Sequence, residues 1–276
     1  MIKLFFKSAL VFLCVLFLSQ SFVLAKSNSS PYKILADNNG VYVIEIVENY
    51  KKNEKAFLQP YVVDELKINE DVYKETGAKL VVNAGFFDPK NQKTVSYVVI
   101  NGETVLNPED NESLMNNITL HPYLDKILNR SEFRILEDEN GKIIYDIAPH
   151  NQEIKEGLKL KHSIQGGPML LPELRLEEEF FVLKRDGKII SESASALHKY
   201  PRTAIGICEN KVYLFIATKD APMSLEDVAN LAQKWGMEKA MGFDGGGSTS
   251  LDTKELHIIS EKENTARKVK SFLILK

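Results

Sequence analysis

The stretch Met241-Gly242-Phe243-Asp244-Gly245-Gly246-Gly247-Ser248-Thr249-Ser250 places an acid, three glycines and three hydroxyls directly after a short apolar run. Three consecutive glycines lose much backbone entropy on folding, so a protein keeps them where the chain needs a positive φ or a close approach. The run from Ala240 to Phe243 predicts a buried strand that ends at Asp244. The glycines suit either an anion-binding nest of N–H groups or a tight turn between strands.

A helix is predicted before this stretch. Ser224 is its expected N-cap, Asp227 its capping-box partner and Gly236 its C-terminal stop. The glycine stretch is not a P-loop, because that motif needs a lysine before the hydroxyl residue and a helix after it. Here Ser248 follows glycine, and Leu251 to Ile259 predicts a strand.

The first 25 residues have the pattern of a signal peptide. Lys3 and Lys7 precede an apolar segment, and Val23-Leu24-Ala25 suits a signal peptidase. The segment is shorter than the ~20 residues of a membrane span, so we expect cleavage after Ala25 and no stable membrane anchor. We therefore expect a secreted or periplasmic protein of the bacterial envelope.

The charge and the cysteine content of the mature chain indicate which ligands and which kind of stabilisation to expect. Without Lys3 and Lys7, the 35 basic residues become 33 against 38 acidic ones, a formal charge of −5 that does not favour nucleic-acid binding. Cys208 is the one cysteine left, so no intramolecular disulfide can form. An exported protein of this kind relies on its core for stability.

Residues 26–276 predict one α+β domain of mixed, mainly antiparallel sheet with few helices, with the motif loops converging at one end. Apolar or β-branched runs predict strands at Val41 to Val47, Phe57 to Val63 and Ala78 to Asn83. A short helix is expected from Asp64 to Thr76, ending at Gly77. Hairpins are expected at Asn101-Gly102, at 139–141 and at Glu209-Asn210. The polar segment 107–162 is interpreted as a possible insertion, and its use as a lid is an open alternative.

Three further stretches carry candidate site residues. Asn83 and Asp88 flank a strand end, where they suit either a site or the capping of a turn. Gly166-Gly167-Pro168 brings the backbone close to a neighbour or a ligand. Arg202 and His198 flank a proline-containing loop, where the arginine is either a bidentate anion ligand or an ordinary surface residue. The run from Glu177 to Glu179 is interpreted as solvated.

Taken in order, four of these motifs resemble the phosphodiester glycosidase family. They are Asn83-Ala84-Gly85-Phe86-Phe87, Gly166-Gly167-Pro168, Pro201-Arg202-Thr203-Ala204-Ile205-Gly206 and Asp244-Gly245-Gly246-Gly247-Ser248-Thr249, and the resemblance runs from about residue 80 to the C-terminus. Two stretches depart from the pattern: Ala217 to Pro222 replaces a Val-Asp-Gly-Arg-like segment, and Ala266-Arg267-Lys268 replaces Glu-Arg-Pro.

The resemblance implies hydrolysis of a sugar-1-phosphodiester at the bond between C1 and oxygen, in a sugar-phosphate or polysaccharide substrate. In that interpretation Asp244 is the first choice for base or electrostatic stabiliser, Asp88 the second, and His198 a proton carrier. Asn83 is expected to bind hydroxyl groups of the sugar. The remaining expected ligands of the phosphate or substrate are Arg202, Thr203, Gly166, Gly167, Gly245, Gly246, Gly247, Ser248 and Thr249.

Two other functions remain open at this stage. A metal-dependent phosphodiesterase would cut the P–O bond with the same acid and arginine, and a non-catalytic envelope protein would bind sugar phosphates without turnover. No cofactor is required by the sequence. A divalent cation bridging Asp244 and the phosphate is compatible with it, but no spacing of ligands demands one.

Overall fold

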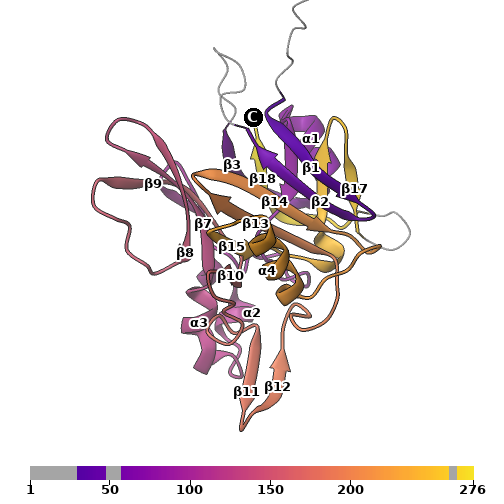
Figure 1. Ribbon diagram of the computed structural model, residues 1–276. Coiled ribbons are helices and arrows are strands. Elements are labelled where there is room, and N and C mark those ends of the chain that lie inside the picture. The colour runs from indigo at the N-terminus through magenta and orange to yellow at the C-terminus, as the bar shows by residue number, and fades with distance from the viewer. Residues whose placement is uncertain (1–29, 48–56, 261–265) are drawn as a thin grey trace, which may run out of the picture.

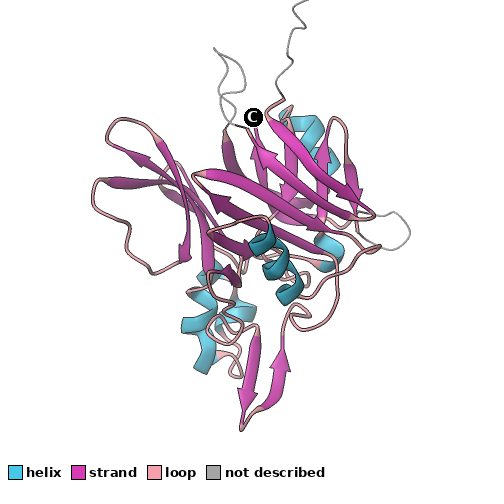
Figure 2. Ribbon diagram, viewed as in Figure 1, coloured by secondary structure: helices cyan, strands magenta, loops and turns pink. Residues whose placement is uncertain are grey.

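The computed structural model describes residues 30–47, 57–260 and 266–276 (Figure 1). The expected signal peptide, residues 1–25, lies outside the described residues. Every strand pairing in the described part of the chain is antiparallel, and its α-helices are four and short (Figure 2). The predicted fold class is therefore confirmed. None of the helices described is both long and apolar enough to cross a membrane.

A six-stranded sheet forms the middle of the molecule. Its strand order is β1 (Tyr32–Asn38), β2 (Val41–Ile46), β14 (Lys211–Ala217), β13 (Arg202–Cys208), β15 (Lys239–Gly242) and β10 (Met169–Leu171). One face is covered by α4 (Leu225–Lys234), whose buried side chains pack with Phe215 and Ala240. The helix starts at the predicted Ser224–Asp227 capping box. The hairpin between β13 and β14 turns at Glu209 and Asn210 as predicted, both with positive φ.

A five-stranded sheet lies against the other face. Its order is β17 (His257–Ile259), β16 (Ser250–Thr253), β4 (Leu80–Asn83), β18 (Val269–Leu275) and β3 (Leu58–Lys67). Alternate residues of β4 and β18 face opposite layers: Leu273 packs in the core between the sheets, and Phe272 packs beneath α1 (Asn69–Thr76). These strands are apolar on both faces because both faces are covered.

A second five-stranded sheet stands beside these two. Its order is β6 (Glu103–Leu106), β5 (Val98–Ile100), β9 (Leu158–Gln165), β7 (Ser131–Asp138) and β8 (Ile143–Pro149). Below it in Figure 1 lie α2 (Glu112–Met115) and α3 (Leu124–Leu128) with the 3₁₀ turns at Pro108–Asp110 and His121–Tyr123. The hairpin of β11 (Val182–Arg185) and β12 (Lys188–Glu192) projects next to these helices.

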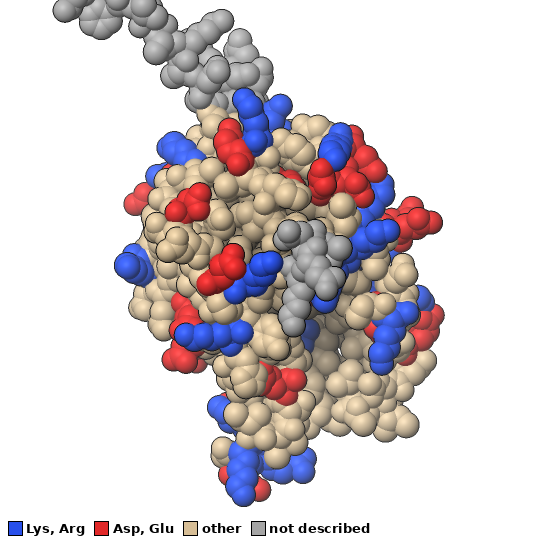
Figure 3. Space-filling view, turned by 90° about the vertical axis from the view of Figure 1, so that its right-hand side faces the viewer, with Lys and Arg blue, Asp and Glu red and all other residues tan. Residues whose placement is uncertain are grey.

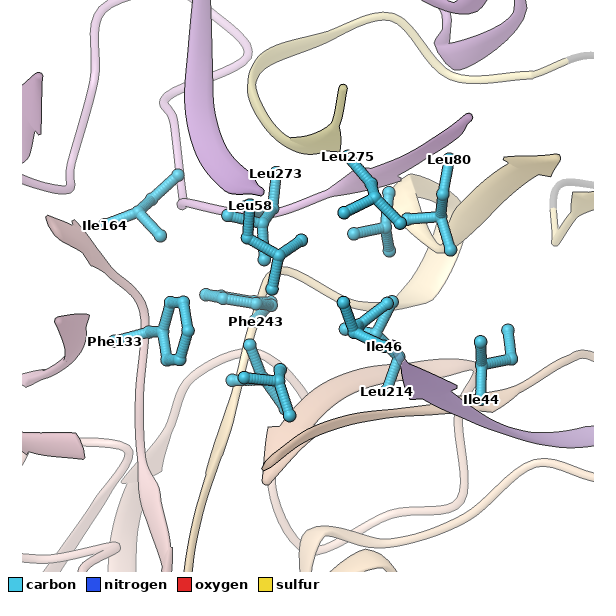
Figure 4. Packing of buried hydrophobic residues seen from close by; sticks show 14 of the residues in the cluster. Ile44, Ile46, Leu58, Leu80, Phe133, Ile164, Leu214, Phe243, Leu273 and Leu275 are labelled. Atoms are coloured by element: carbon cyan, nitrogen blue, oxygen red, sulfur yellow. The ribbon is translucent and has the colours of Figure 1, made fainter. Parts of the chain in front are cut away.

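All three sheets share one core. Phe243 lies in its middle, with Phe133 on one side and Ile46 on the other (Figure 4). Phe133 and Ile147 come from segment 107–162 and are fully buried. Segment 107–162 therefore supplies core strands, and these strands do not behave as a lid. Whether the segment is an insertion relative to other family members stays a prediction.

Two local boundaries differ from the predictions. The expected helix from Asp64 is wrong over its first residues, because β3 continues to Lys67 and keeps its pairing with β18. The expected strand from Leu251 to Ile259 is two strands, since Thr253 Oγ1 accepts hydrogen bonds from two backbone N–H groups and closes a turn. In both places a long-range pairing or a side-chain turn overrides the local apolar pattern.

Candidate active site

The four motifs meet around the strand end at Asp244. Asp244 N–H donates to the carbonyl oxygen of Ala84 at 2.8 Å, and Gly246 N–H donates to that of Pro201 at 2.8 Å. On the other side, Gly167 N–H donates to the carbonyl oxygen of Gly242 at 2.9 Å. The predicted convergence of the motif loops is therefore confirmed.

The Asn83 amide is the junction of three of these elements. Its Nδ2 donates to the backbone oxygen of Asp244 at 2.6 Å, and its Oδ1 accepts from Thr203 Oγ1 at 2.8 Å and from Ser250 N–H at 3.1 Å. Asn83 and Thr203 are both buried. Neither side chain is open to a sugar or a phosphate, so we assign them to positioning Asp244 and not to the substrate contacts expected from the sequence.

Replacing Asn83 is expected to cost stability. Asn83→Ala leaves the Ser250 N–H and the Thr203 hydroxyl without their buried acceptor, and the expected loss is about 3 kcal/mol in the free energy of unfolding. Thr203→Val is the matched control, because it removes one of these hydrogen bonds at nearly constant volume and is expected to lose about 1 kcal/mol. Urea titration of both variants measures the difference. Equal stability of the Asn83 variant and the wild type would contradict the assigned role.

Arg202 does not present its guanidinium to a ligand. The side chain is buried and donates to four backbone oxygens: Nε to Met223 at 2.9 Å, Nη1 to Ala194 at 3.0 Å, and Nη2 to Ser195 and His198 at 2.6 and 2.8 Å. Desolvation lowers its pKa to about 10, so it stays charged at neutral pH. The expectation that Arg202 grips the phosphate is corrected: it fixes the loop 194–198 against Met223.

The Gly166-Gly167 pair is a packing device. A Cβ on Gly166 would lie 2.6 Å from the carbonyl oxygen of Gly242, and one on Gly167 would lie 2.5 Å from Glu179 Oε2. Gly167 also has a φ of +98°. Both glycines are buried, so they bring β10 against β15 and do not form a substrate surface.

Glu179 is a buried group that the sequence reasoning missed. The run from Glu177 to Glu179 predicts a solvated segment, but the Glu179 side chain is buried and accepts from Ser131 N–H, Ser131 Oγ and Met169 N–H at 2.7–3.1 Å. Burial raises the pKa of the carboxyl, and these three donors oppose that rise. The buried N–H groups of Ser131 and Met169 require an acceptor. The sequence of three glutamates does not indicate which of their carboxylates is that acceptor.

His198 and Asp88 lie apart from the junction. The His198 side chain is 71% exposed, with Nε2 3.4 Å from Glu192. Asp88 Oδ1 accepts from Lys90 N–H at 2.8 Å, and the Asp88 backbone closes the same turn with Lys93. Asp88 therefore caps a turn, which was the alternative interpretation, and neither residue forms a hydrogen bond with Asp244.

The Asp244 carboxyl is the chemically perturbed group of the site. Desolvation raises its pKa to about 6, opposed by the Ser248 hydroxyl, by the positive charge of Arg267 and by the Gly245 N–H. Ser248 Oγ lies close enough to oppose the rise but makes no hydrogen bond of ordinary geometry. A carboxyl with a pKa near 6 changes protonation in the range where a general base works.

The glycine loop offers fewer N–H groups than a three-amide nest. It is a 3₁₀ turn (Gly246–Ser248), in which Gly246 N–H is bonded to Pro201 and Gly245 N–H faces the Asp244 carboxyl. Gly247 N–H has no partner among the described residues. The hydroxyls of Ser248 and Thr249 are buried without a hydrogen bond there. The loop therefore leaves one amide, that of Gly247, for a ligand, because the two hydroxyls predicted as ligands are as buried as the side chains of Asn83 and Thr203.

Arg267 is a cation that acts electrostatically on the Asp244 carboxyl. It is exposed at the entry to β18, within electrostatic reach of Asp244.

On the face shown in Figure 3, basic and acidic side chains alternate without a large patch of one sign. Among the described residues, no three His, Cys, Asp or Glu side chains converge as ligands for a metal ion.

Comparison with known proteins gives one family and several similar folds. The family model described as phosphodiester glycosidase matches residues 76–276. The catalytic domain of zebrafish N-acetylglucosamine-1-phosphodiester α-N-acetylglucosaminidase, auto-inhibited by its pro-peptide, is 16% identical, with a TM-score of 0.62 over 90% of this chain and 84% of that one. No curated protein sequence matches.

Two bacterial structures share the fold as well. A hypothetical protein from Synechocystis is 15% identical with a TM-score of 0.58, over 88% of this chain and 61% of that one, so this chain spans less than two thirds of its length. A putative exported protein from Burkholderia pseudomallei is 12% identical with a TM-score of 0.50, over 85% of this chain and 73% of that one. At these identities the likeness shows the fold alone.

Proposed function

The chain belongs to the phosphodiester glycosidase family, and we propose that it is an exported hydrolase that cleaves the bond between a sugar C1 and its phosphodiester oxygen. The proposed substrates are polysaccharides or glycoconjugates of the cell envelope. The observation that carries the proposal is the desolvated Asp244 carboxyl, with a pKa of about 6, on which Ser248, Arg267 and the Gly245 N–H act.

The proposed reaction has little need of a general acid to protonate the leaving group. As the C1–O bond breaks, its electron pair leaves with the phosphate, which is already a stable anion, and positive charge develops on the sugar ring. Asp244 in its ionised form stabilises that charge and accepts a proton from the water that attacks C1. The products are a free sugar and a phosphomonoester.

Anion binding is assigned to the glycine loop and to Arg267. Gly247 N–H, which has no partner among the described residues, is a directed donor, and Arg267 supplies positive charge. A phosphate held here would lie beside Asp244. The backbone contacts of Asn83 keep that arrangement fixed before the substrate arrives.

Release of sugar from UDP-N-acetylglucosamine or from a methyl-phospho-sugar tests the proposal. The purified protein is expected to release the sugar, and parallel reactions with EDTA decide whether a divalent cation takes part. Absence of release, with the same compounds raising the melting temperature, would contradict the proposed hydrolysis and favour a sugar-phosphate-binding protein.

Arg267→Ala is expected to raise KM for these substrates about 10-fold or more, because the phosphodiester loses a charged partner. Lys268→Ala is the matched control, since Lys268 is the next residue and also exposed, and its KM is expected to stay within twofold. Arg267→Lys keeps the charge and is expected to fall between them. Steady-state kinetics of the three variants give the comparison, and equal KM values for Arg267→Ala and Lys268→Ala would contradict the assignment.

A further inference from the structure

A cavity of about 340 Å³ lies apart from Asp244, between the turn that starts at Asp88, the helices α2 and α3, and the base of the β11–β12 hairpin. Phe180 and Ser193 line it from the hairpin side, and Ile127 and Arg130 line it from the end of α3. Its size is that of pockets that hold one small ligand.

Arg130 is the charged group in the cavity wall. The residue is 7% exposed, with Cζ 4.1 Å from the centre of the Phe181 ring and 5.7 Å from that of Phe86. Nε donates to the backbone oxygen of Glu179 at 3.0 Å, and Nη2 donates to that of Phe180 at 3.4 Å. Nη1 has no hydrogen-bond partner among the described residues. An arginine so placed keeps two N–H donors for something that enters the cavity.

Within the described part of the chain, no carboxylate is hydrogen-bonded to this guanidinium. The oxygens of Glu179 are taken by Ser131 and Met169, and Asp88, which also lines the cavity, accepts from Lys90 N–H. Burial lowers the pKa of Arg130 to about 10, and the negative charge of Glu179 opposes that fall without a hydrogen bond to the guanidinium, so the side chain is positively charged at neutral pH. A desolvated cation without a bonded counter-charge favours an anionic ligand.

The rest of the wall has both kinds of surface that a sugar ring presents. Val95, Leu114 and Ile127 are apolar, whereas Ser113 and Asn117 are polar and exposed at the rim. Hexoses offer hydroxyls at their edges and C–H groups on their faces. The combination with Arg130 suits a hexose that carries a phosphate or a carboxylate.

The cavity is close to the junction of the motifs. Ala84 accepts the hydrogen bond from Asp244 N–H, and Asp88, four residues further along, lines the cavity. Four residues span at most roughly 14 Å. The two sites are therefore near enough for nearby units of one oligomer to occupy both.

We propose that this cavity is a second binding site, which holds a sugar unit bearing an anionic group while a neighbouring unit is cut at Asp244. Binding of an anionic sugar in the cavity is inferred independently of the proposed function. Cleavage of the neighbouring unit at Asp244 rests on the proposed function. It assigns the substrate class as an oligomer or polymer with repeated negative charge, in which Arg130 recognises the unit next to the scissile one.

Calorimetric titration of the purified protein with glucose 6-phosphate, glucuronic acid and neutral glucose tests the site. We expect binding of at least one of the two anionic sugars, and at least tenfold weaker binding of glucose. Comparison of glucose 6-phosphate with glucuronic acid shows whether the site prefers a phosphate or a carboxylate. Ser113→Glu adds a negative charge at the rim and is expected to weaken anion binding about tenfold. Ser113→Gln is the uncharged control and is expected to stay within twofold.

Two further variants separate this site from the catalytic one. Arg130→Met keeps the length of the side chain and is expected to abolish the binding event that Ser113→Glu weakens, with a melting curve to check folding, whereas Arg267→Ala is expected to leave that event unchanged. These titrations need no turnover, so they hold even if the hydrolysis assay fails. Unchanged binding in Ser113→Glu, or no binding of either anionic sugar at 10 mM (a concentration of about ten times a millimolar Kd), would overturn the proposal.

Discussion

Asp244→Asn is expected to lower the rate of sugar release by about 10²–10⁴-fold, the range typical of losing a general base. The amide has nearly the shape of the carboxyl, so the hydrogen bonds from Asn83 and to Ala84, which involve the backbone of residue 244, are retained. The loss is therefore expected in kcat, with a small change in KM. Steady-state kinetics at pH 8 measure it.

The raised pKa of Asp244 sets the pH dependence of the wild type. The carboxyl acts in its ionised form, so kcat is expected to fall as the pH drops through about 6. An acid limb near pH 4, the ordinary range for aspartate, would contradict the assignment of Asp244 as the group that titrates.

The same variant is expected to be more stable than the wild type. Because the folded-state pKa lies above the unfolded value, ionisation of Asp244 costs stability, and the cost develops between about pH 4 and pH 6 and is complete above it. It amounts to at most about 3 kcal/mol, and to less where solvent reaches the group. Melting curves of Asp244→Asn and wild type should differ at pH 8 and coincide near pH 3.5.

Arg202→Ala is expected to destabilise the protein by at least about 3 kcal/mol. The substitution leaves four backbone oxygens, of Met223, Ala194, Ser195 and His198, without their donor. Urea unfolding measures the loss. If the variant folds at low temperature, its KM is expected to stay within a few fold of the wild type, because the guanidinium does not face the substrate.

Arg202→Lys is the conservative comparison. A lysine keeps the charge but has a compact ammonium that does not reproduce the planar fork, so an intermediate loss of stability is expected. A wild-type melting temperature for Arg202→Ala, together with a large rise in KM, would show that the arginine binds phosphate after all.

Local signals in the sequence were enough for many elements of the fold. The capping box at Ser224 and the turn at Asn101-Gly102, where both residues adopt positive φ, are set by side chains within a few residues. The apolar run before Asp244 predicts a buried strand because both faces of β15 are covered. The order of the four motifs was enough to identify the family.

The roles of individual polar residues were harder to predict from the sequence. A sequence shows which donors exist but not which buried acceptors compete for them, and for Arg202 the loop 194–198 takes four bonds. Asn83 is engaged in the same way by Thr203 and Ser250. In the run from Glu177 to Glu179 only the last residue is buried, because the N–H groups of Ser131 and Met169 lie on its side.

Hydrolysis in water enriched in ¹⁸O tests the proposed function most directly. With a sugar-1-phosphodiester as substrate, cleavage between C1 and oxygen places the label on the released sugar and leaves the phosphomonoester unlabelled. Mass spectrometry of both products is expected to show that distribution. Label in the phosphate would mean that the P–O bond is cut, and it would contradict the assignment of this protein as a glycosidase.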